Sequence, residues 1–176
     1  MDVLELLLHP VRIRIVNAFS GGQTRTTAEL CARLADVSQA TIYRHVALLT
    51  DAGVLQVVDA RPVRGALERH YQIDRHRAQI SHGEAAKMTR EDHRMAFAAA
   101  MAALIADFGT YLDTAEADPI SDGVGYRQIP VWLTDQERNE LRDRLEQDLK
   151  AHFHNTSTPG RRHYLISPIL IPVAAP

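Results

Sequence analysis

Residues 36–55, which read DVSQATIYRHVALLTDAGVL, form a helical pattern with two unlike faces. Ile42, Val46 and Leu49 recur at positions i, i+4 and i+7, which is the spacing of a buried helical stripe. The opposite face and its shoulders carry Gln39, Ala40, Thr41, Tyr43, Arg44, His45 and Ala47. Surface helices usually expose glutamate and lysine, but this helix has no carboxylate before Asp51. The exposed face therefore needs an explanation beyond contact with water.

Local signals predict two further helices upstream of this one. Residues 4–19 carry apolar side chains at helical spacing, and Pro10 indicates that the main helix begins near it. A second, shorter helix is expected to run to about Ala35. Thr26 and Glu29 have the spacing of a capping box, so they mark its start.

The third helix has its own boundary signals, and a hairpin pattern follows it. Ser38 is a natural N-cap and Gly53 a natural C-terminal stop. Two β-like runs, VLQVVD at 54–59 and LERHYQID at 67–74, flank the turn-forming stretch ARPVRGA. Three helices followed by a hairpin is the order of a winged helix-turn-helix, whose third helix enters the major groove of DNA. The sequence therefore predicts such a domain over residues 1–78.

The exposed side chains of the third helix suit DNA. A helix in the major groove must reach base edges and must not turn carboxylates toward phosphates. Gln39 can pair with adenine and Arg44 with guanine, while threonine and alanine can touch a thymine methyl group. Ser38 and Tyr43 can bond phosphates and fix the register. The predicted DNA contacts, including two arginines at the expected wing tip, are Ser38, Gln39, Ala40, Thr41, Tyr43, Arg44, His45, Arg61 and Arg64.

Two stretches resemble the ArsR family of bacterial winged-helix repressors: LLHPVRIRIVNAF (7–19) and TTAELCARLADVSQATIYRHVALLTDAGVL (26–55). The resemblance extends over roughly residues 4–74 and rests on a His-Pro-x-Arg start, a Ser-Gln-x-Thr motif, a His-x-x-x-Leu pair and an Ala-Gly exit, all in register. It implies a DNA-binding transcriptional regulator of repressor type, with residues 38–45 on the DNA-reading helix.

The sequence departs from the family at the metal sites. Metal-sensing members carry paired cysteines, but Cys31 is the single cysteine here, and one thiolate cannot make a soft-metal site. A second family site lies on the helix after the wing, where this chain offers only Asp92 and His93. We therefore expect no metal site, no cofactor and no metal response by the paired-cysteine route.

Residues 79–176 are predicted to form a dimerisation and effector region. Thr89 and Asp92 have capping-box spacing and open a long helix over 92–113. Four apolar side chains on it are spaced 4, 3 and 4 residues apart, the rhythm of a helix that pairs with another helix. This seam, the predicted interface of a homodimer, consists of Phe97, Met101, Leu104 and Phe108.

A β-α-β region is predicted over residues 126–173, which makes the whole chain α+β. YRQIPVWL (126–133) alternates like a strand, Thr134 and Glu137 cap a helix of about 17 residues, and HYLISPILIPV (163–173) predicts a final strand. Two strands with one helix are not stable alone. We therefore expect them to pack on the long helix or on a partner subunit.

Composition narrows the function classes. The 176 residues are 45% hydrophobic and 24% charged, as in a globular protein. The net charge is −2, with +1 in residues 1–75 and −3 in 76–176, so a nucleic-acid surface must be a local cluster in the first half. The longest uncharged apolar run, 95–106, is too short to cross a bilayer, so we expect a cytoplasmic protein without membrane contact. No catalytic motif is found, so we expect no enzyme.

Two alternatives remain open. The winged helix can serve as a protein-interaction module that does not bind DNA. The apolar stripe of the second half can line a pocket for a small-molecule effector, whose identity the sequence does not show, with Met95, Phe97, Met101 and Trp132 as candidate residues. Arg69 is a weaker DNA contact than Arg61 or Arg64, because strand alternation places it on the side of Leu67 and Tyr71.

Overall fold

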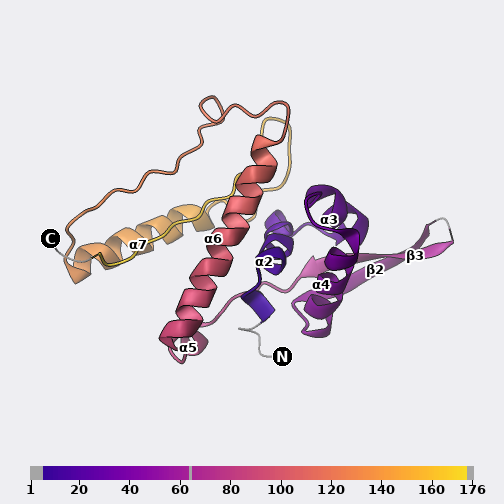
Figure 1. The fold of residues 1–176 in the computed structure, drawn as a ribbon, viewed down its shortest axis with the longest axis horizontal. Helices are drawn as coiled ribbons and strands as arrows, with labels where there is room; N and C mark the ends of the chain where they lie inside the picture. Colours follow the sequence, from indigo (N-terminus) through magenta and orange to yellow (C-terminus); the bar gives the residue numbers. More distant parts are fainter. Residues whose placement is uncertain (1–5, 64, 174–176) are drawn as a thin grey trace.

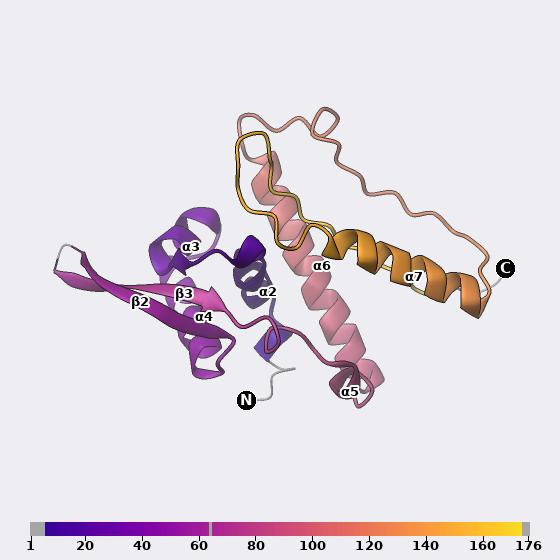
Figure 2. The ribbon, with the colours of Figure 1, turned by 180° about the vertical axis from the view of Figure 1, so that it is seen from behind.

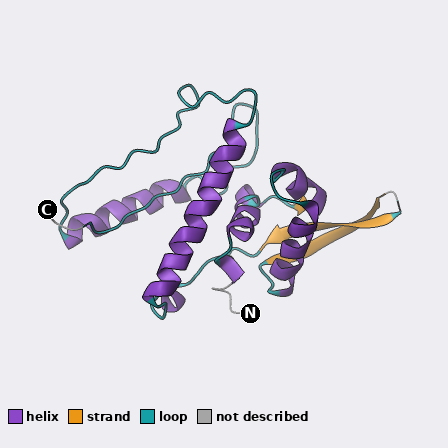
Figure 3. Cartoon of the chain, viewed as in Figure 1, coloured by secondary structure: helices purple, strands orange, loops and turns teal. Residues whose placement is uncertain are grey.

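The protein has an α+β fold in a computed structural model that describes residues 6–63 and 65–173 (Figure 1). In chain order the elements are α2 (Pro10–Asn17), the 3-10 helix η1 (Ser20–Gly22), β1 (Arg25–Thr26), α3 (Thr27–Arg33), α4 (Gln39–Asp51), β2 (Leu55–Val63), β3 (Ala66–Ile73), α5 (His82–Ala85), α6 (Arg90–Leu112) and α7 (Asp135–Lys150). Figure 3 shows the wing of β2 and β3 projecting from one side of the molecule and α7 from the other.

The helices begin where the local signals predict. Pro10 opens α2, and the Nδ1 atom of His9 accepts the N–H of Val11 at 3.2 Å. Thr26 and Glu29 form the predicted capping box of α3. Ser38 caps α4, which ends just before Gly53, whose φ of +72° suits glycine. These predictions are confirmed. They could be made from the sequence because each helix start depends only on residues that are close together in the chain.

The predicted apolar stripe of α4 lies at the centre of the core. Ile42, Val46 and Leu49 are at most 2% exposed. The same cluster includes Ile15, Phe19, Leu30, Leu34, Leu55 and Tyr71, from the helices before α4 and from the wing. Burial of such a side chain contributes about 1.5–3 kcal/mol, so this cluster holds α4 firmly against the domain.

The wing is longer than predicted and belongs to a three-stranded antiparallel sheet of order β1-β3-β2. The register pairs Leu55 with Ile73 at the base and Val63 with Ala66 at the tip, with a bulge between Val57 and Asp59. The third strand, β1, was not predicted, because two residues are too few to show strand alternation.

Helix α6 packs beside α2, as Figures 1 and 2 show, and buries Ala99 and Ala103. Its predicted capping box of Thr89 and Asp92 is present. By length and composition alone α6 is long and apolar enough to cross a membrane. The expectation of a protein without membrane contact rested on the twelve-residue uncharged run 95–106, which is part of this longer helix, and it stays a prediction. In this fold Asp107 ties α6 to α2 through a buried arginine.

The remainder of the chain, residues 113–173, is here called the C-terminal segment. Helix α7 forms as predicted, with a capping box of Thr134 and Glu137. The two predicted strands flanking it do not form, because residues 126–133 and 163–173 run as irregular chain (Figure 2). The apolar spacing of Leu141, Leu145, Leu149 and Phe153 predicts that they face inward, but no residue of α7 is buried and Phe153 is exposed, so this chain alone does not cover them.

Candidate nucleic-acid interface

The exposed face of α4 is the centre of the candidate site. Gln39, Ala40, Tyr43, Arg44 and Ala47 are all exposed, and none carries a carboxylate. They lie opposite the three core residues of the same helix, as the 3.6-residue period requires. The structure thus places these predicted residues together on one solvent-facing surface.

The start of α4 uses two of the predicted contact residues for capping. The Oγ atom of Ser38 accepts the N–H of Thr41 at 3.3 Å, and the two hydroxyl oxygens lie 2.8 Å apart. Ser38 remains exposed and Thr41 is half-buried. Both hydroxyls therefore lie at the edge of the α4 face and hold the first turn of the helix in place.

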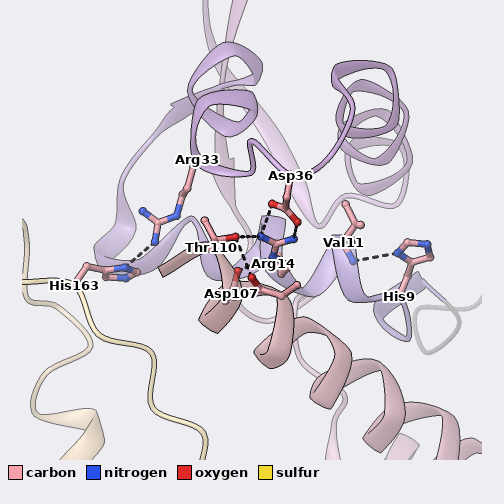
Figure 4. Close-up of polar contacts among 9 residues, drawn as sticks. His9, Val11, Arg14, Arg33, Asp36, Asp107, Thr110 and His163 are labelled. Carbon is pink, nitrogen blue, oxygen red and sulfur yellow. Dashed lines mark hydrogen bonds and ion pairs between the residues drawn. The ribbon is translucent and has the colours of Figure 1, made fainter. Parts of the chain in front are cut away.

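Arg14 of α2 joins the turn before α4 to helix α6 (Figure 4). Its side chain is 2% exposed and donates to both carboxylate oxygens of Asp36, at 2.6 and 2.8 Å. It also donates to Oδ1 of Asp107 at 2.6 Å and to the Thr110 hydroxyl at 3.2 Å. These bonds, the one with Asp36 first, raise the pKa of Arg14, and the same guanidinium lowers the pKa of Asp36. One buried cation thus connects the helix-turn-helix with α6.

Sequence reasoning missed this network because its members are far apart in the chain. One signal was present, since Arg14 falls among the apolar side chains of α2, next to Ile15. A charge in such a position requires partners. The identity of those partners, however, depends on how α6 packs.

His45 is an exception among the predicted DNA contacts. It is 2% exposed, and its ring lies against that of His9 with the centroids 4.4 Å apart. Neither ring nitrogen has a hydrogen-bond partner among the described residues. Burial, followed by the positive charges of His9, Arg12 and Arg44, lowers the pKa of His45 to about 4. The expectation that His45 lies on the exposed face is therefore wrong, because the chain leading into α2 covers that shoulder of α4.

The wing places Arg61 differently from the sequence prediction, which put it at the tip. Arg61 lies within β2 opposite Glu68, and its exposed guanidinium donates from Nε to Asp59 at 2.6 Å. This bond lowers the pKa of Asp59. The strands extend so far that the turn is two residues long, and Arg64 within it lies outside the described residues.

Arg69, which the sequence made a weaker candidate than Arg61 or Arg64, lies beside the exposed face of α4. It is exposed on β3 and lines a shallow depression of about 210 Å³ between α4 and the sheet. Tyr43 and Ala47 of the α4 face line the same depression, together with the acidic Asp51. Strand alternation did place Arg69 on the side of Tyr71, as predicted, but that side is the one that meets α4.

The predicted seam residues of α6 are unevenly covered. Phe97 and Phe108 are 49% and 37% exposed, while Met101 and Leu104 are half-buried. The ring of Phe108 lies 6.0 Å from that of Tyr111 and 6.3 Å from that of Tyr126. The seam therefore keeps an open apolar edge in the single chain.

The described residues contain no group of three histidine, cysteine or acidic side chains arranged to hold a metal ion. Cys31 is half-buried on α3, and burial raises the pKa of its thiol. A thiol held in its protonated form is a poor metal ligand and a poor nucleophile.

Comparison with known families agrees with this geometry. Residues 7–58 match the family model of a helix-turn-helix domain, a stretch that runs from before α2 into β2. A comparison with curated proteins found no match. The chain therefore carries a helix-turn-helix domain, which is a DNA-binding regulatory module and not a catalytic one.

Proposed function

We propose that this protein is a sequence-specific transcriptional regulator of the ArsR-like type, which acts as a repressor on double-stranded DNA in the cytoplasm. The observation that carries the proposal is the exposed face of α4 between Ser38 and Ala47, which is free of carboxylates and held in place by a buried core. A partner protein would not require such a face, whereas the phosphates that line a DNA groove do.

In this proposal α4 lies in the major groove. Arg44 at the exposed pole pairs with guanine, and Gln39 pairs with adenine. Tyr43 and Ser38 bond phosphates and fix the register of the helix on the duplex. Arg69 adds a cation beside α4, and Arg61 on the wing follows the backbone. His45 is not part of this contact set, since its ring is buried.

We further propose that the protein binds as a homodimer through the α6 seam of Phe97, Met101, Leu104 and Phe108. One recognition helix supplies only a few base contacts, while two linked half-sites multiply the affinity and fit a palindromic operator. The open apolar edge of α6 supports this proposal, because monomers rarely leave such a stripe in water.

Regulation in this proposal does not depend on a paired-cysteine metal site, because Cys31 is the single cysteine of the sequence. A small-molecule effector would act on the C-terminal part of the chain. Arg14 would couple a movement of α6 to the turn before α4, because its guanidinium is hydrogen-bonded to Asp107 of α6 and to Asp36 of that turn.

The test is a gel-shift titration with DNA from upstream of the protein's own gene, beside random DNA at the same salt concentration. We expect Arg44→Ala to weaken operator binding by about 1–3 kcal/mol, which is roughly 5- to 150-fold, with a smaller loss on random DNA. Arg94→Ala is the matched control, because this exposed arginine of α6 bonds only its neighbour Glu91 among the contacts described.

The outcomes separate the competing functions. Equal losses on both DNAs would make Arg44 a phosphate contact and remove it from base recognition. If the parent protein retains no DNA even at low salt, where phosphate contacts are strongest, the winged helix is a protein-interaction module and the proposal fails.

A further inference from the structure

The C-terminal segment exposes an unusual amount of apolar surface. Of the 26 large apolar side chains that are exposed among the described residues, 16 lie between residues 113 and 173. They concentrate in two irregular runs, 126–133 and 163–173, and on α7 between them. Soluble monomers rarely leave so many neighbouring apolar groups in water, so this surface favours contact with a partner.

The backbone of the two runs is also unpaired. Residues 125–133 and 162–173 form no backbone–backbone hydrogen bond within the described chain. Residues 128–133 and 163–173 contain no charged side chain other than His163, should it be protonated. Uncharged chain with unpaired backbone groups is a template for pairing with another strand, and Pro130, Pro168 and Pro172, which have no N–H, restrict that pairing to the edge of a sheet or to bulges.

Helix α7 has one polar face and one apolar face, and the apolar face is not covered by the rest of the described chain. Its polar face is satisfied internally, for example by Lys150 with Glu146 at 2.6 Å and Arg138 with Asp135 at 2.9 Å. Its other face carries Leu141 and Leu145, which are 44% and 40% exposed. An amphipathic helix of this kind lays its apolar stripe on a sheet or on another helix.

The chain brings the two runs close at their starts without pairing them. Arg162, directly before the second run, forms an ion pair with Asp122, four residues before the first. The Tyr126 ring contacts Phe108 of α6. Even so, no ladder forms between the runs. Two strands and one helix are too few to be stable alone, which explains why a single chain leaves them open.

We propose that the C-terminal segments of two copies of this chain join, so that residues 126–133 and 163–173 pair as β-strands across the interface and each α7 lies on the shared sheet. The lengths agree, since a 16-residue helix spans about 24 Å and an eight-residue strand about 26 Å. This surface extends the proposed dimer beyond α6, and it requires a second copy but no contact with DNA.

Charge and symmetry favour a second copy over other partners. Residues 126–173 hold seven Lys+Arg and six Asp+Glu, so two identical segments do not repel each other and do not attract a polyanion. Each chain carries the two features that such an interface needs, namely unpaired strand-like runs and an uncovered apolar stripe on α7. A two-fold axis therefore places the strand edges and the helix stripe of each copy against those of the other, in a closed interface.

Trp132 offers a direct test, because it is the only tryptophan and lies exposed in the first run. Leu170→Glu places a charge in the second run and leaves the reporter intact. Ile120→Glu, at an exposed side chain outside both runs, is the matched control. Ile129→Glu repeats the disruption from the first run. All three positions are exposed in the single chain, so none should unfold the winged domain, which circular dichroism and urea titration check.

We expect the parent to sediment as a dimer, with Trp132 protected from acrylamide quenching and slow amide exchange in both runs. Leu170→Glu and Ile129→Glu should lose the protection of Trp132 and of the amides, whereas Ile120→Glu should keep both. Dilution of the parent below its dimer dissociation constant should reproduce the Leu170→Glu result.

Three results would overturn the proposal. A dimer whose Trp132 is freely quenched would leave α6 as the interface. Slow amide exchange in a monomer, independent of concentration, would mean that the runs pair within one chain. Protection of Trp132 only on adding neutral phosphatidylcholine vesicles would assign the surface to lipid. Operator binding is scored separately, so a C-terminal dimer that ignores DNA would refute the proposed function and leave this inference standing.

Discussion

The winged domain and the C-terminal segment use similar apolar patterns with opposite results. In α4 the stripe of Ile42, Val46 and Leu49 is buried, whereas in α7 the stripe of Leu141 and Leu145 is open. Both helices have good N-caps, and both form at the residues that those caps predict. The difference shows that local sequence decides where a helix begins. Whether its apolar face is buried depends on which other elements, of the same chain or of a partner, pack against it.

The largest effect that separates the two regions is expected from truncating one leucine in each. Leu49→Ala leaves a cavity in a fully buried cluster and should lower the free energy of unfolding by about 2–5 kcal/mol. Leu141→Ala removes a side chain that this chain leaves 44% exposed, so at low protein concentration its cost should stay below about 1 kcal/mol. Urea titration of both variants at micromolar concentration measures the two costs.

A large, concentration-dependent loss in Leu141→Ala would show that α7 is covered in the assembly. A large loss that does not depend on concentration would contradict the contrast itself, because α7 would then pack within one chain.

This contrast also explains how much the sequence could predict. The caps of α3, α4, α6 and α7 were predictable, since each depends on residues three positions apart. The exposed face of α4 was predictable too, because it follows from helical period. The strands at 126–133 and 163–173 were not, since a strand exists only when a partner pairs with it.

Two features of the site required the tertiary structure. His45 falls on the shoulder of α4, where helical period alone cannot decide between exposure and burial, and the chain around His9 decides it. Arg14 finds Asp36 and Asp107 at sequence distances of 22 and 93 residues, which no local pattern encodes.

Acid should destabilise the winged domain through His45. Its pKa in the fold is about 4, below the ordinary value of 6.5, so the folded state binds the proton less well than the unfolded chain. The stability that results is complete above pH 6.5 and is lost as the pH falls toward 4, by roughly 3 kcal/mol. Urea titrations of the parent and of His45→Leu at several pH values measure this loss.

We expect a shallower pH dependence in His45→Leu between pH 6.5 and 4, because leucine has no proton to bind. Equal slopes in the two proteins would mean that the ring of His45 is reached by water and that its burial does not control acid stability.

A smaller effect is expected from Arg14→Ala, which breaks the link between α6 and the turn before α4. Charged hydrogen bonds of this kind contribute about 1.5–3 kcal/mol each in favourable cases, but both carboxylate partners keep part of their exposure to water. We therefore expect a loss of about 2 kcal/mol in the unfolding free energy. Arg138→Ala, which breaks an exposed pair on α7, should cost less than about 0.5 kcal/mol.

Amide exchange distinguishes a link from a simple loss of stability. If Arg14 couples the elements, Arg14→Ala should speed exchange at the start of α4 and in the part of α6 around Asp107, and leave α3 unchanged. Uniform acceleration throughout the winged domain would make Arg14 an ordinary stabilising residue.

The smallest effect is expected where the two regions meet, at His163. Its ring accepts a hydrogen bond from Arg33 of α3 at Nδ1, at 2.8 Å (Figure 4). Its Nε2 lies 2.6 Å from the Ser20 hydroxyl oxygen. Burial, then the charges of Arg33 and Arg25, lower the pKa of His163, although Asp107 acts in the opposite direction. Because the fold favours the neutral ring, this contact is complete above pH 6.5 and weakens as the pH falls.

His163→Ala should therefore change the unfolding free energy of the winged domain by less than about 1 kcal/mol, since surface contacts contribute little. It should nevertheless release the chain around residues 155–163, which limited proteolysis at pH 7.5 detects as faster cleavage there. Acidification of the parent from pH 7.5 to values below 6.5 should progressively produce the same cleavage, whereas His152→Ala, which removes an exposed histidine with a local partner in Asn155, should not. Cleavage of the parent that is equally fast throughout this pH range would show that the segment is not fastened at His163 and that the two regions meet elsewhere.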